Sequence, residues 1–407
     1  MFNQELWLYG TCAFPLLTFY LFTKNDTIKL APTSTIHNLI LMTLATAHFT
    51  IPLLHDGNGD KLGMSAVGLI ASCLSARMVF YTIDLNRLPV GGRIPPLWDV
   101  ITPEPSEKPE KIVTVPIQKV RSDALCWLLM ANLSLFMLMP VMVPFDTFLR
   151  VCAVPPETFS SKSYGYVLLD FITLRGKLPL RSLYYHMVMG FTVHLHVAIL
   201  LPLYRIFRSA QLLAYSFLPV KNKTELVQPY YTAYIWLVDQ PPIFNKPWLS
   251  RSAYELWSKR WHQKFRPGFL RIGYFPIKRL FGKQTKAGHI AAVMGAFVVS
   301  GLMHDYVLLT IRGYSQFNQV GVKGYQTIFF VLQAIASIVS SPDFPLGPKQ
   351  LPLWVGRLLT VSWIAVTGPL FMEPYVRISF QTTMEVPVFP YIDSAYAAPF
   401  CPYGLAN

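Results

Sequence analysis

The segment Tyr254–Arg266 combines residue types that can bind an anion with one that can move a proton. It reads Tyr-Glu-Leu-Trp-Ser-Lys-Arg-Trp-His-Gln-Lys-Phe-Arg and lies in a basic stretch, Lys246–Lys286, whose only acid is Glu255. If the segment is helical, residues three or four apart share a face. One face then carries Trp257, Arg260, Trp261 and Lys264, and the other carries Lys259, His262 and Arg266. Tryptophans beside an arginine are also typical of a helix anchored at the membrane interface, which is the plainer interpretation.

A second candidate site lies in the apolar stretch that ends in Ser300-Gly-Leu-Met-His304-Asp305. An ionisable residue inside an apolar span is a candidate functional residue, because burying its charge in hydrocarbon costs about 2.5–3.5 kcal/mol. On a helix Ser300 and His304 share a face, and we expect Gly301 to leave space beside them for a ligand. Asp305 points about 100° away, so we expect it to contact a neighbouring helix. A neutral buried histidine is a competent general base; the alternative for His304 is a satisfied interhelical hydrogen bond.

The elements that position these residues are expected to be transmembrane helices. Of the 407 residues, 53% are hydrophobic and 14% are charged, whereas soluble domains carry about 25% charged residues. A bilayer core of about 30 Å needs roughly 20 apolar residues per helix, so we expect an all-α polytopic membrane protein with about eight to nine transmembrane helices in a single domain, residues 1–407. The clearest spans are Leu6–Phe22, Ile36–Leu54, Met64–Ile83, Ala124–Phe145, Leu183–Phe207, His289–Ile311, Tyr325–Ser340 and Leu353–Phe371. The shorter apolar runs Ala210–Val220 and Tyr230–Val238 are expected to be re-entrant or interfacial helices.

Charge and cysteine patterns restrict the partners. The net charge of +14 is concentrated beside the predicted spans, where anionic lipid headgroups or a polyanionic cosubstrate are better partners than nucleic acid. The positive-inside tendency places residues 84–123 and Lys246–Lys286 in the cytosol and the N-terminus in the lumen. The five cysteines show no C-x-x-C spacing and lie mostly in apolar surroundings, so we expect small core hydrophobes and neither a disulfide framework nor a metal site. His194 and His196 are two positions apart and cannot share a helix face, so a metal-binding pair is not expected either.

These motifs together resemble those of a known family. Pro241-x-x-Phe-Asn-x-Pro247, then the segment ending Trp257-Ser-Lys-Arg-Trp-His-Gln-Lys-Phe-Arg266, then Ser300-Gly-Leu-Met-His-Asp305 are similar to the wax synthase-like branch of the membrane-bound O-acyltransferase superfamily. The resemblance covers a motif core at about residues 239–305. The chain departs from the family pattern where Leu256 replaces an aromatic residue, Lys259 an arginine and Asp305 a glutamate. Lys259 keeps the charge but loses the bidentate fork of arginine.

The resemblance implies a reaction and a role for each matched residue. His304 would be the catalytic base, and His262 would occupy the place of an asparagine that assists catalysis in related branches. The residues expected to contribute to the acyl-CoA site are Trp257, Arg260, Trp261, Lys264, Lys259 and Arg266, with Asn245, Ser300, Gly301 and Asp305 in support. Acyl-CoA would be a cosubstrate, with no tightly bound cofactor and no metal.

The resemblance also suggests substrates. Fungal members of similar length resemble acetyltransferases of terpenoid or meroterpenoid alcohols, so we expect acetyl transfer from acetyl-CoA to a hydrophobic natural-product alcohol in secondary metabolism. The alternatives are a long-chain wax ester synthase and a transporter in which His304 and Asp305 form a proton relay. The expected location is the endoplasmic reticulum membrane, and the sequence leaves the oligomeric state open.

Overall fold

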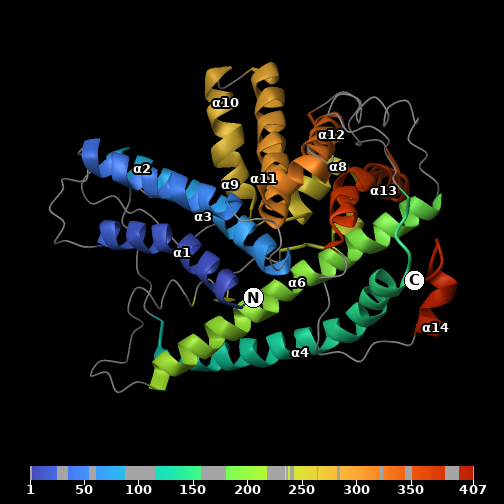
Figure 1. Cartoon of the computed structure of the whole chain (residues 1–407), viewed down its shortest axis with the longest axis horizontal. Helices are drawn as coiled ribbons and strands as arrows, with labels where there is room; N and C mark the ends of the chain where they lie inside the picture. Colours follow the sequence, from blue (N-terminus) through green and yellow to red (C-terminus); the bar gives the residue numbers. More distant parts are fainter. Residues whose placement is uncertain are drawn as a thin grey trace.

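The computed structural model confirms an all-helical membrane architecture (Figure 1). It describes residues 2–24, 35–54, 61–87, 115–156, 180–217, 234, 237–238, 243–263, 265–281, 285–320, 324–343, 351–380 and 394–406. Each span predicted above coincides with a helix. In this part of the chain, six helices are long and apolar enough to cross a membrane. They are α2 with η1 (Thr35–Leu53), α3 (Lys61–Arg87), α4 (Ile117–Val151), α6 (Leu180–Phe217), α11 (Lys286–Val320) and α13 (Leu353–Arg377).

Two further predicted spans are also helical. Helix α1 covers Phe2–Lys24, and α12 covers Tyr325–Val339. At 15 residues α12 is about 22 Å long, so it is shorter than the hydrocarbon core of a bilayer. The prediction of a separate interfacial helix at Ala210–Val220 is wrong for the described residues 210–217, because α6 continues without a break through Phe217. The run Tyr230–Val238 lies largely outside the described residues.

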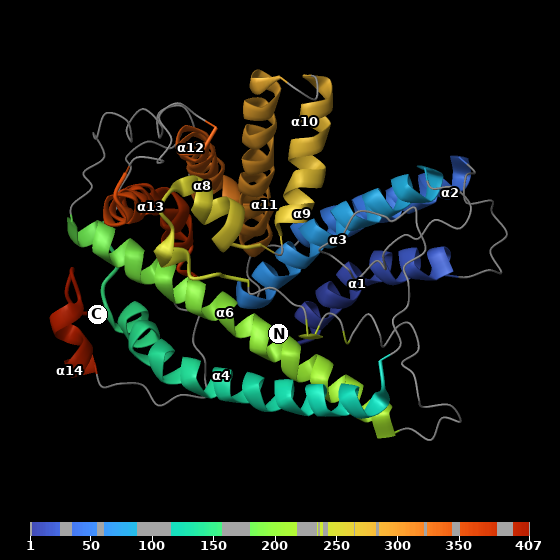
Figure 2. The ribbon, with the colours of Figure 1, turned by 180° about the vertical axis from the view of Figure 1, so that it is seen from behind.

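The helices form two groups that meet along α6. Helices α4 and α6, of 35 and 38 residues, pack against each other and cross the whole molecule (Figures 1 and 2). Helix α4 bends towards its C-terminal end, where Pro140 and Pro144 remove backbone hydrogen bonds. On the other side α1, α2 and α3 pack together, α3 packs on α11, and α11 continues the contacts through α12 to α13. Helix α13 then contacts α6, which closes the arrangement.

The basic stretch is more ordered than a loop. Helix α9 (Arg266–Phe269), the π-helical segment η4 (Leu270–Tyr274) and α10 (Phe275–Leu280) follow one another and run beside α11 (Figure 1). Glycines allow this close approach: a Cβ atom on Gly273 would lie 2.5 Å from the backbone oxygen of Gly295. Arg271 also forms an ion pair with Asp84 at the end of α3. The hairpin of α10 and α11 thus holds the segment with the candidate site against the bundle.

A disulfide corrects the prediction for the cysteines. Cys152, directly after α4, is bonded to Cys401 near the C-terminus, while Cys12, Cys73 and Cys126 are free. The amide of Ala153 donates a hydrogen bond to the carbonyl of Gly404, so the C-terminal segment is fixed to the end of α4 by backbone as well as by sulfur. The pairing joins positions 249 residues apart, and no local spacing indicates it.

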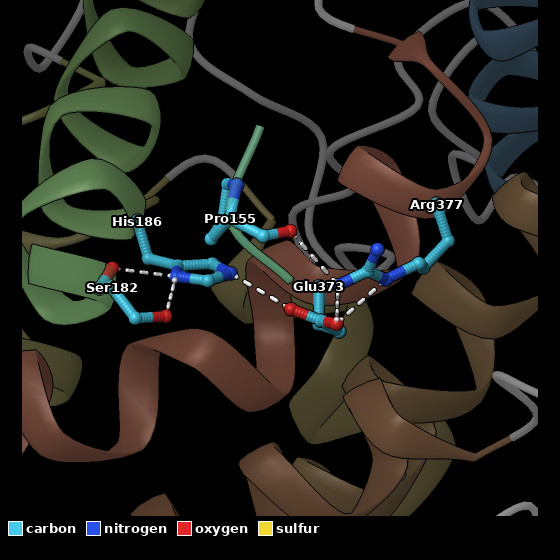
Figure 3. A network of polar contacts seen from close by, with 5 residues as sticks. All are labelled: Pro155, Ser182, His186, Glu373 and Arg377. Atoms are coloured by element: carbon cyan, nitrogen blue, oxygen red, sulfur yellow. Dashed lines mark hydrogen bonds and ion pairs between the residues drawn. The ribbon is translucent and has the colours of Figure 1, made fainter. Parts of the chain in front are cut away.

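Near the same place a buried polar network connects three elements (Figure 3). His186 at the start of α6 makes hydrogen bonds to the backbone oxygen of Ser182 at 2.7 Å and to Glu373 of α13 at 2.9 Å. Arg377 donates to the other oxygen of Glu373 at 2.7 Å and to the carbonyl of Pro155 at 3.3 Å. Both ring nitrogens of His186 therefore have partners, as expected for a structural buried histidine.

Candidate active site

The motif segment, Tyr254–Arg266, begins as a short helix and then reverses direction sharply. The Ser252 side chain accepts a hydrogen bond from the amide of Glu255 and caps α8 (Ala253–Glu255), which widens into the π-helical segment η3 (Leu256–Arg260). Trp261 is extended, and His262 has a left-handed φ of 46°. Tyr254–Arg266 is therefore not one continuous helix, and the two faces that such a helix would have do not form. A left-handed residue ends a helix because it turns the backbone away from the axis.

Arg260 holds this reversal in place. Its guanidinium forms an ion pair with Glu255 at 2.7 Å and donates to the backbone oxygens of Asn245 at 3.1 Å and Lys246 at 3.4 Å. The amide of Asn245 in turn donates to the carbonyl of Arg260. Burial raises the pKa of Glu255, but hydrogen bonds from Arg251 and Arg260 and their positive charges outweigh burial and leave this pKa below its ordinary value. Glu255 is therefore ionised, and its ion pair fixes the position of Arg260.

The cations of the motif do not share one environment. Lys259 and Arg266 are exposed, whereas Arg260 is engaged as described above. Lys264 lies outside the described residues. A polyanionic ligand can therefore reach Lys259 and Arg266 directly from water.

Trp257 and Trp261 lie in a cluster of aromatic side chains. The Trp257 ring lies 6.0 Å from that of Trp261, 5.7 Å from Phe330 of α12 and 5.8 Å from Phe297 of α11. Trp261 lies 4.7 Å from Phe244, on the preceding loop. The Nε1 atom of Trp257 is buried and has no hydrogen-bond partner among the described residues. An indole N–H only donates, so this atom is available to an acceptor on a ligand.

His304 joins the same cluster from α11. Its ring stacks on Phe330 at 5.1 Å with 16° between the planes, and it lies 5.0 Å from Phe371 of α13. Phe330 also contacts Trp257. No hydrogen bond to the His304 ring is found within the described ranges. The structure thus places His304 against the motif segment and leaves its imidazole without the interhelical partner that a structural histidine would have.

His262 completes the link between the two motifs. Its Nδ1 atom is buried without a partner in the described part of the chain, and its ring lies 5.3 Å from Trp261. Burial, the largest cause, and electrostatic interaction with His304 and His194 together lower the pKa of His262 to about 3. His262 is therefore neutral at physiological pH. Its left-handed backbone costs on the order of 1–3 kcal/mol, and such strain is concentrated at functional sites.

Of the supporting residues, Asp305 has the contact that was predicted, whereas Gly301 lacks the free space that was predicted beside it. The prediction that Asp305 contacts a neighbouring helix is confirmed, because Thr327 of α12 donates a hydrogen bond to its carboxylate at 2.5 Å. The space expected beside Gly301 is absent: a Cβ atom there would lie 2.6 Å from the Cα atom of Thr327. Gly301 therefore allows α11 and α12 to approach each other, and it does not leave room for a ligand. Ser300 is buried on the same helix.

His194 of α6 also belongs to this site, although it is not among the site residues predicted from the sequence. Its ring lies 5.5 Å from Trp261 and 4.1 Å from Phe244, and its Nδ1 atom is buried without a partner among the residues described. The signal that could have identified it is an ionisable side chain inside an apolar span. Within the described ranges no group of three or more His, Cys, Asp or Glu side chains could hold a metal ion.

A cavity of about 210 Å³ lies beside the cluster, between α3 and α11. Phe265 is in its wall and also contacts His262, at 5.4 Å between the rings. Met303, next to His304 in sequence, lines the cavity as well. Most of the wall is aromatic or aliphatic, and Arg77 and Arg271 are its charged members. The cavity is therefore suited to the apolar part of a ligand.

Comparison with known proteins gives similarities that include this site. Residues 240–332 match the family described as membrane bound O-acyl transferase, and this range contains the motif segment, His304 and most of α12. A probable long-chain-alcohol O-fatty-acyltransferase 3 of Arabidopsis thaliana is 26% identical over 41% of this chain and 50% of its own length. The long-chain-alcohol O-fatty-acyltransferase of Simmondsia chinensis is 29% identical over 37% of this chain and 43% of its own length.

A third relative is named for a different acceptor, a sterol. Acyl-CoA–sterol O-acyltransferase 1 of Arabidopsis thaliana is 40% identical over 33% of this chain and 39% of its own length. The chain thus matches half or less of the length of each of these curated relatives.

Proposed function

We propose that the protein is an acyl-CoA-dependent O-acyltransferase that esterifies a hydrophobic alcohol inside the membrane. The observation that carries the proposal is that one aromatic cluster joins His262 of the first motif to His304 of the second. Neither histidine has the full set of hydrogen bonds that a structural buried histidine has. His304 has no hydrogen bond among the described residues, and Nδ1 of His262 is buried without a partner. The match of residues 240–332 to the acyltransferase family supports it.

In the proposed reaction His304 is the general base. Its imidazole accepts the hydroxyl proton of the alcohol while the alcohol oxygen attacks the thioester carbonyl, and general-base catalysis contributes typically about 10²–10⁴-fold. The carbonyl oxygen gains negative charge in this step, and neutral His262 or the indole N–H of Trp257 can donate a hydrogen bond to it. The carbon–sulfur bond then breaks, and the coenzyme A thiolate receives the proton from His304. The products are an ester and free coenzyme A.

Acyl-CoA would bind with its phosphates at the exposed cations of the basic stretch. Lys259 and Arg266 are exposed beside the reversal at His262, so they can bind phosphates while the thioester reaches the aromatic cluster. We assign Arg260 to shaping this loop, because its donors are occupied by Glu255 and by backbone oxygens. The cavity lined by Phe265 and Met303 would receive an apolar part of a substrate.

Two substrate pairs follow from different observations. Acetyl transfer to a polycyclic terpenoid-type alcohol is the prediction from the sequence, and the similarity to a protein named for sterol acylation supports a polycyclic acceptor. Fatty acyl transfer to a long-chain alcohol is supported by similarity to proteins named for that reaction. We also propose the endoplasmic reticulum as the location, because the disulfide of Cys152 needs an oxidising compartment such as its lumen. The segment of residues 84–123 is predicted to be cytosolic, so the end of α4 would be lumenal.

The test uses microsomes from a host that expresses the protein. Acetyl-CoA and palmitoyl-CoA are each supplied with hexadecanol or a sterol, and released coenzyme A and labelled ester are measured. The proposal predicts release of coenzyme A that depends on the added alcohol and exceeds that of control microsomes. Ester formation no faster than in the control with every pair would contradict it and would favour a transporter.

A further inference from the structure

We infer that His194 binds the hydroxyl group of the acceptor alcohol through its Nδ1 atom. The inference rests on the proposed function and assigns the acceptor, an apolar alcohol, to a place between α6 and the motif segment. His194 is neither in the matched range 240–332 nor in either sequence motif.

His194 has an unused hydrogen-bonding atom. Its Nδ1 is buried without a partner among the described residues, although leaving a buried polar atom unpaired is unfavourable. Nδ1 of His262 and Nε1 of Trp257 are in the same condition. Ring contacts through Trp261 connect all three residues: Trp261 lies 5.5 Å from His194, 5.3 Å from His262 and 6.0 Å from Trp257. Three such atoms around one tryptophan indicate polar groups of a ligand.

The neighbouring histidine on the same helix shows the contrast. Nδ1 of His196 is hydrogen-bonded to the backbone oxygen of Thr192 at 2.9 Å, and its ring faces Asp146 of α4. A histidine on α6 can therefore form a hydrogen bond between Nδ1 and the backbone oxygen four residues earlier. His194 forms no such bond, and its ring lies in the aromatic cluster instead.

Two exposed aromatic residues beside His194 indicate which substrate meets it. Its ring contacts Phe191 of the membrane-spanning helix α6, which is 40% exposed, and Trp248 of the short turn η2 (Pro247–Leu249), which is 58% exposed. An exposed aromatic side chain on a membrane-spanning helix faces lipid, and an exposed tryptophan at the start of the basic stretch is typical of the membrane interface. His194 thus lies at the lipid-facing edge of the aromatic cluster. A hydrophobic alcohol can approach from the bilayer. The phosphates of coenzyme A cannot, because charges are expelled from hydrocarbon.

His194 is also connected to the proposed base through shared aromatic neighbours. The rings of His194 and His262 both contact Phe244 and Trp261. Trp261 in turn contacts Trp257, and Phe330 contacts both Trp257 and His304. A hydroxyl that accepts or donates at His194 is therefore bound at the same aromatic cluster as the group that would take its proton. In this arrangement His194 selects and orients the acceptor, and His304 carries out the proton transfer.

The test separates the nitrogen from the ring. His194→Phe keeps an aromatic ring against Trp261 and removes Nδ1, whereas His194→Asn places an amide atom near the Nδ1 position. Microsomes with each variant are labelled with diazirine derivatives of hexadecanol and of a sterol, with excess unlabelled alcohol as competitor. His196→Phe is the matched control, since it removes an imidazole two positions away on the same helix.

We expect His194→Phe to weaken competition by the alcohol about 3- to 10-fold, the effect of losing one neutral hydrogen bond, and His194→Asn to restore most of it. His196→Phe should label like the wild type. Where ester formation is measurable, the Michaelis constant for the alcohol should rise in His194→Phe while that for acyl-CoA stays constant.

Unchanged competition in His194→Phe would overturn the inference and leave His194 as a packing residue. Absence of saturable labelling of the wild type by both probes would overturn it too. Because the probes report binding, saturable labelling that depends on Nδ1 in a protein without turnover would uphold the inference while the proposed reaction fails.

Discussion

His186 and His304 are both histidines on long membrane helices, and their surroundings differ in one respect. The ring of His186 has a partner at each nitrogen, the backbone of Ser182 and the carboxylate of Glu373 (Figure 3). The ring of His304 lies between Phe330 and Phe371 without a hydrogen bond from the described residues. Buried polar groups in proteins are satisfied with few exceptions, so the satisfied histidine is expected to stabilise the fold and the unsatisfied one to act on a ligand.

The largest effect is expected for His304→Ala. Removing the base should reduce turnover by about 10²–10⁴-fold, because the group that accepts the hydroxyl proton in the proposed reaction is lost. Coenzyme A release is measured in microsomes at equal amounts of folded protein. His289→Ala is the control: His289 is exposed near the start of the same helix, and it should keep wild-type turnover. Equal losses in the two variants would assign the effect of His304→Ala to damage of α11.

Replacement of His262 should separate its charge from its hydrogen bonding. His262→Asn is expected to keep turnover within about tenfold of the wild type, since asparagine offers neutral hydrogen-bonding groups and tolerates a left-handed backbone. His262→Phe, which has no such group, is expected to lose about 10²–10³-fold, as for an oxyanion donor. If the phenylalanine variant were as active as the asparagine variant, His262 would have no polar role.

The pKa of His262 also gives a pH dependence. The folded chain takes up this proton at about pH 3 and the unfolded chain at about 6.5, so the unfolded state binds more protons between these values. Lowering the pH from 6.5 towards 3 should therefore destabilise the folded wild type progressively. His262→Asn should weaken this dependence, measured as the thermal midpoint of detergent-solubilised protein. Parallel pH profiles in the two proteins would contradict the buried, neutral state of His262.

An intermediate effect is expected where the satisfied network is broken. His186→Ala removes one partner of Glu373 and should cost about 1–3 kcal/mol of stability, visible as a lower thermal midpoint and lower accumulation. The molecules that remain folded should keep turnover within a few-fold, because His186 does not contact the aromatic cluster of His304 in the described structure. Loss of turnover per folded molecule would remove the distinction between the two histidines.

The smallest effect is expected at the exposed cations. Lys259→Gln combined with Arg266→Gln should raise the Michaelis constant for acyl-CoA severalfold at low ionic strength, and less at high salt, since exposed charges are screened. Arg181→Gln is a suitable control, because Arg181 is exposed at the start of α6, the end predicted to be lumenal. A Michaelis constant that does not change would indicate that Lys259 and Arg266 contact lipid headgroups.

Much of the architecture could be predicted from the sequence. Hydropathy located the membrane helices, because a bilayer imposes their length and composition, and the ionisable residue within an apolar span singled out His304. The contact of Asp305 with another helix followed from helical geometry and is confirmed by Thr327. These predictions depend on local periodicity, which is directly readable from a chain.

The predictions that failed depend on tertiary contacts. The helix over the motif segment ends at Arg260 because the ion pair with Glu255 and the carbonyls of Asn245 and Lys246 fix a reversal there. Gly301 was expected to leave space, and its role is visible only once Thr327 is placed against it. The bond between Cys152 and Cys401 likewise depends on which helix ends meet.

The most direct test of the central claim measures His304→Ala and His186→Ala side by side for two quantities, the folded fraction and alcohol-dependent coenzyme A release per folded molecule. The satisfied and unsatisfied environments predict opposite results. His304→Ala should fold like the wild type and lose at least about a hundredfold in release, whereas His186→Ala should fold less well and keep its release. Release per folded molecule that is the same in His304→Ala as in the wild type would contradict the claim.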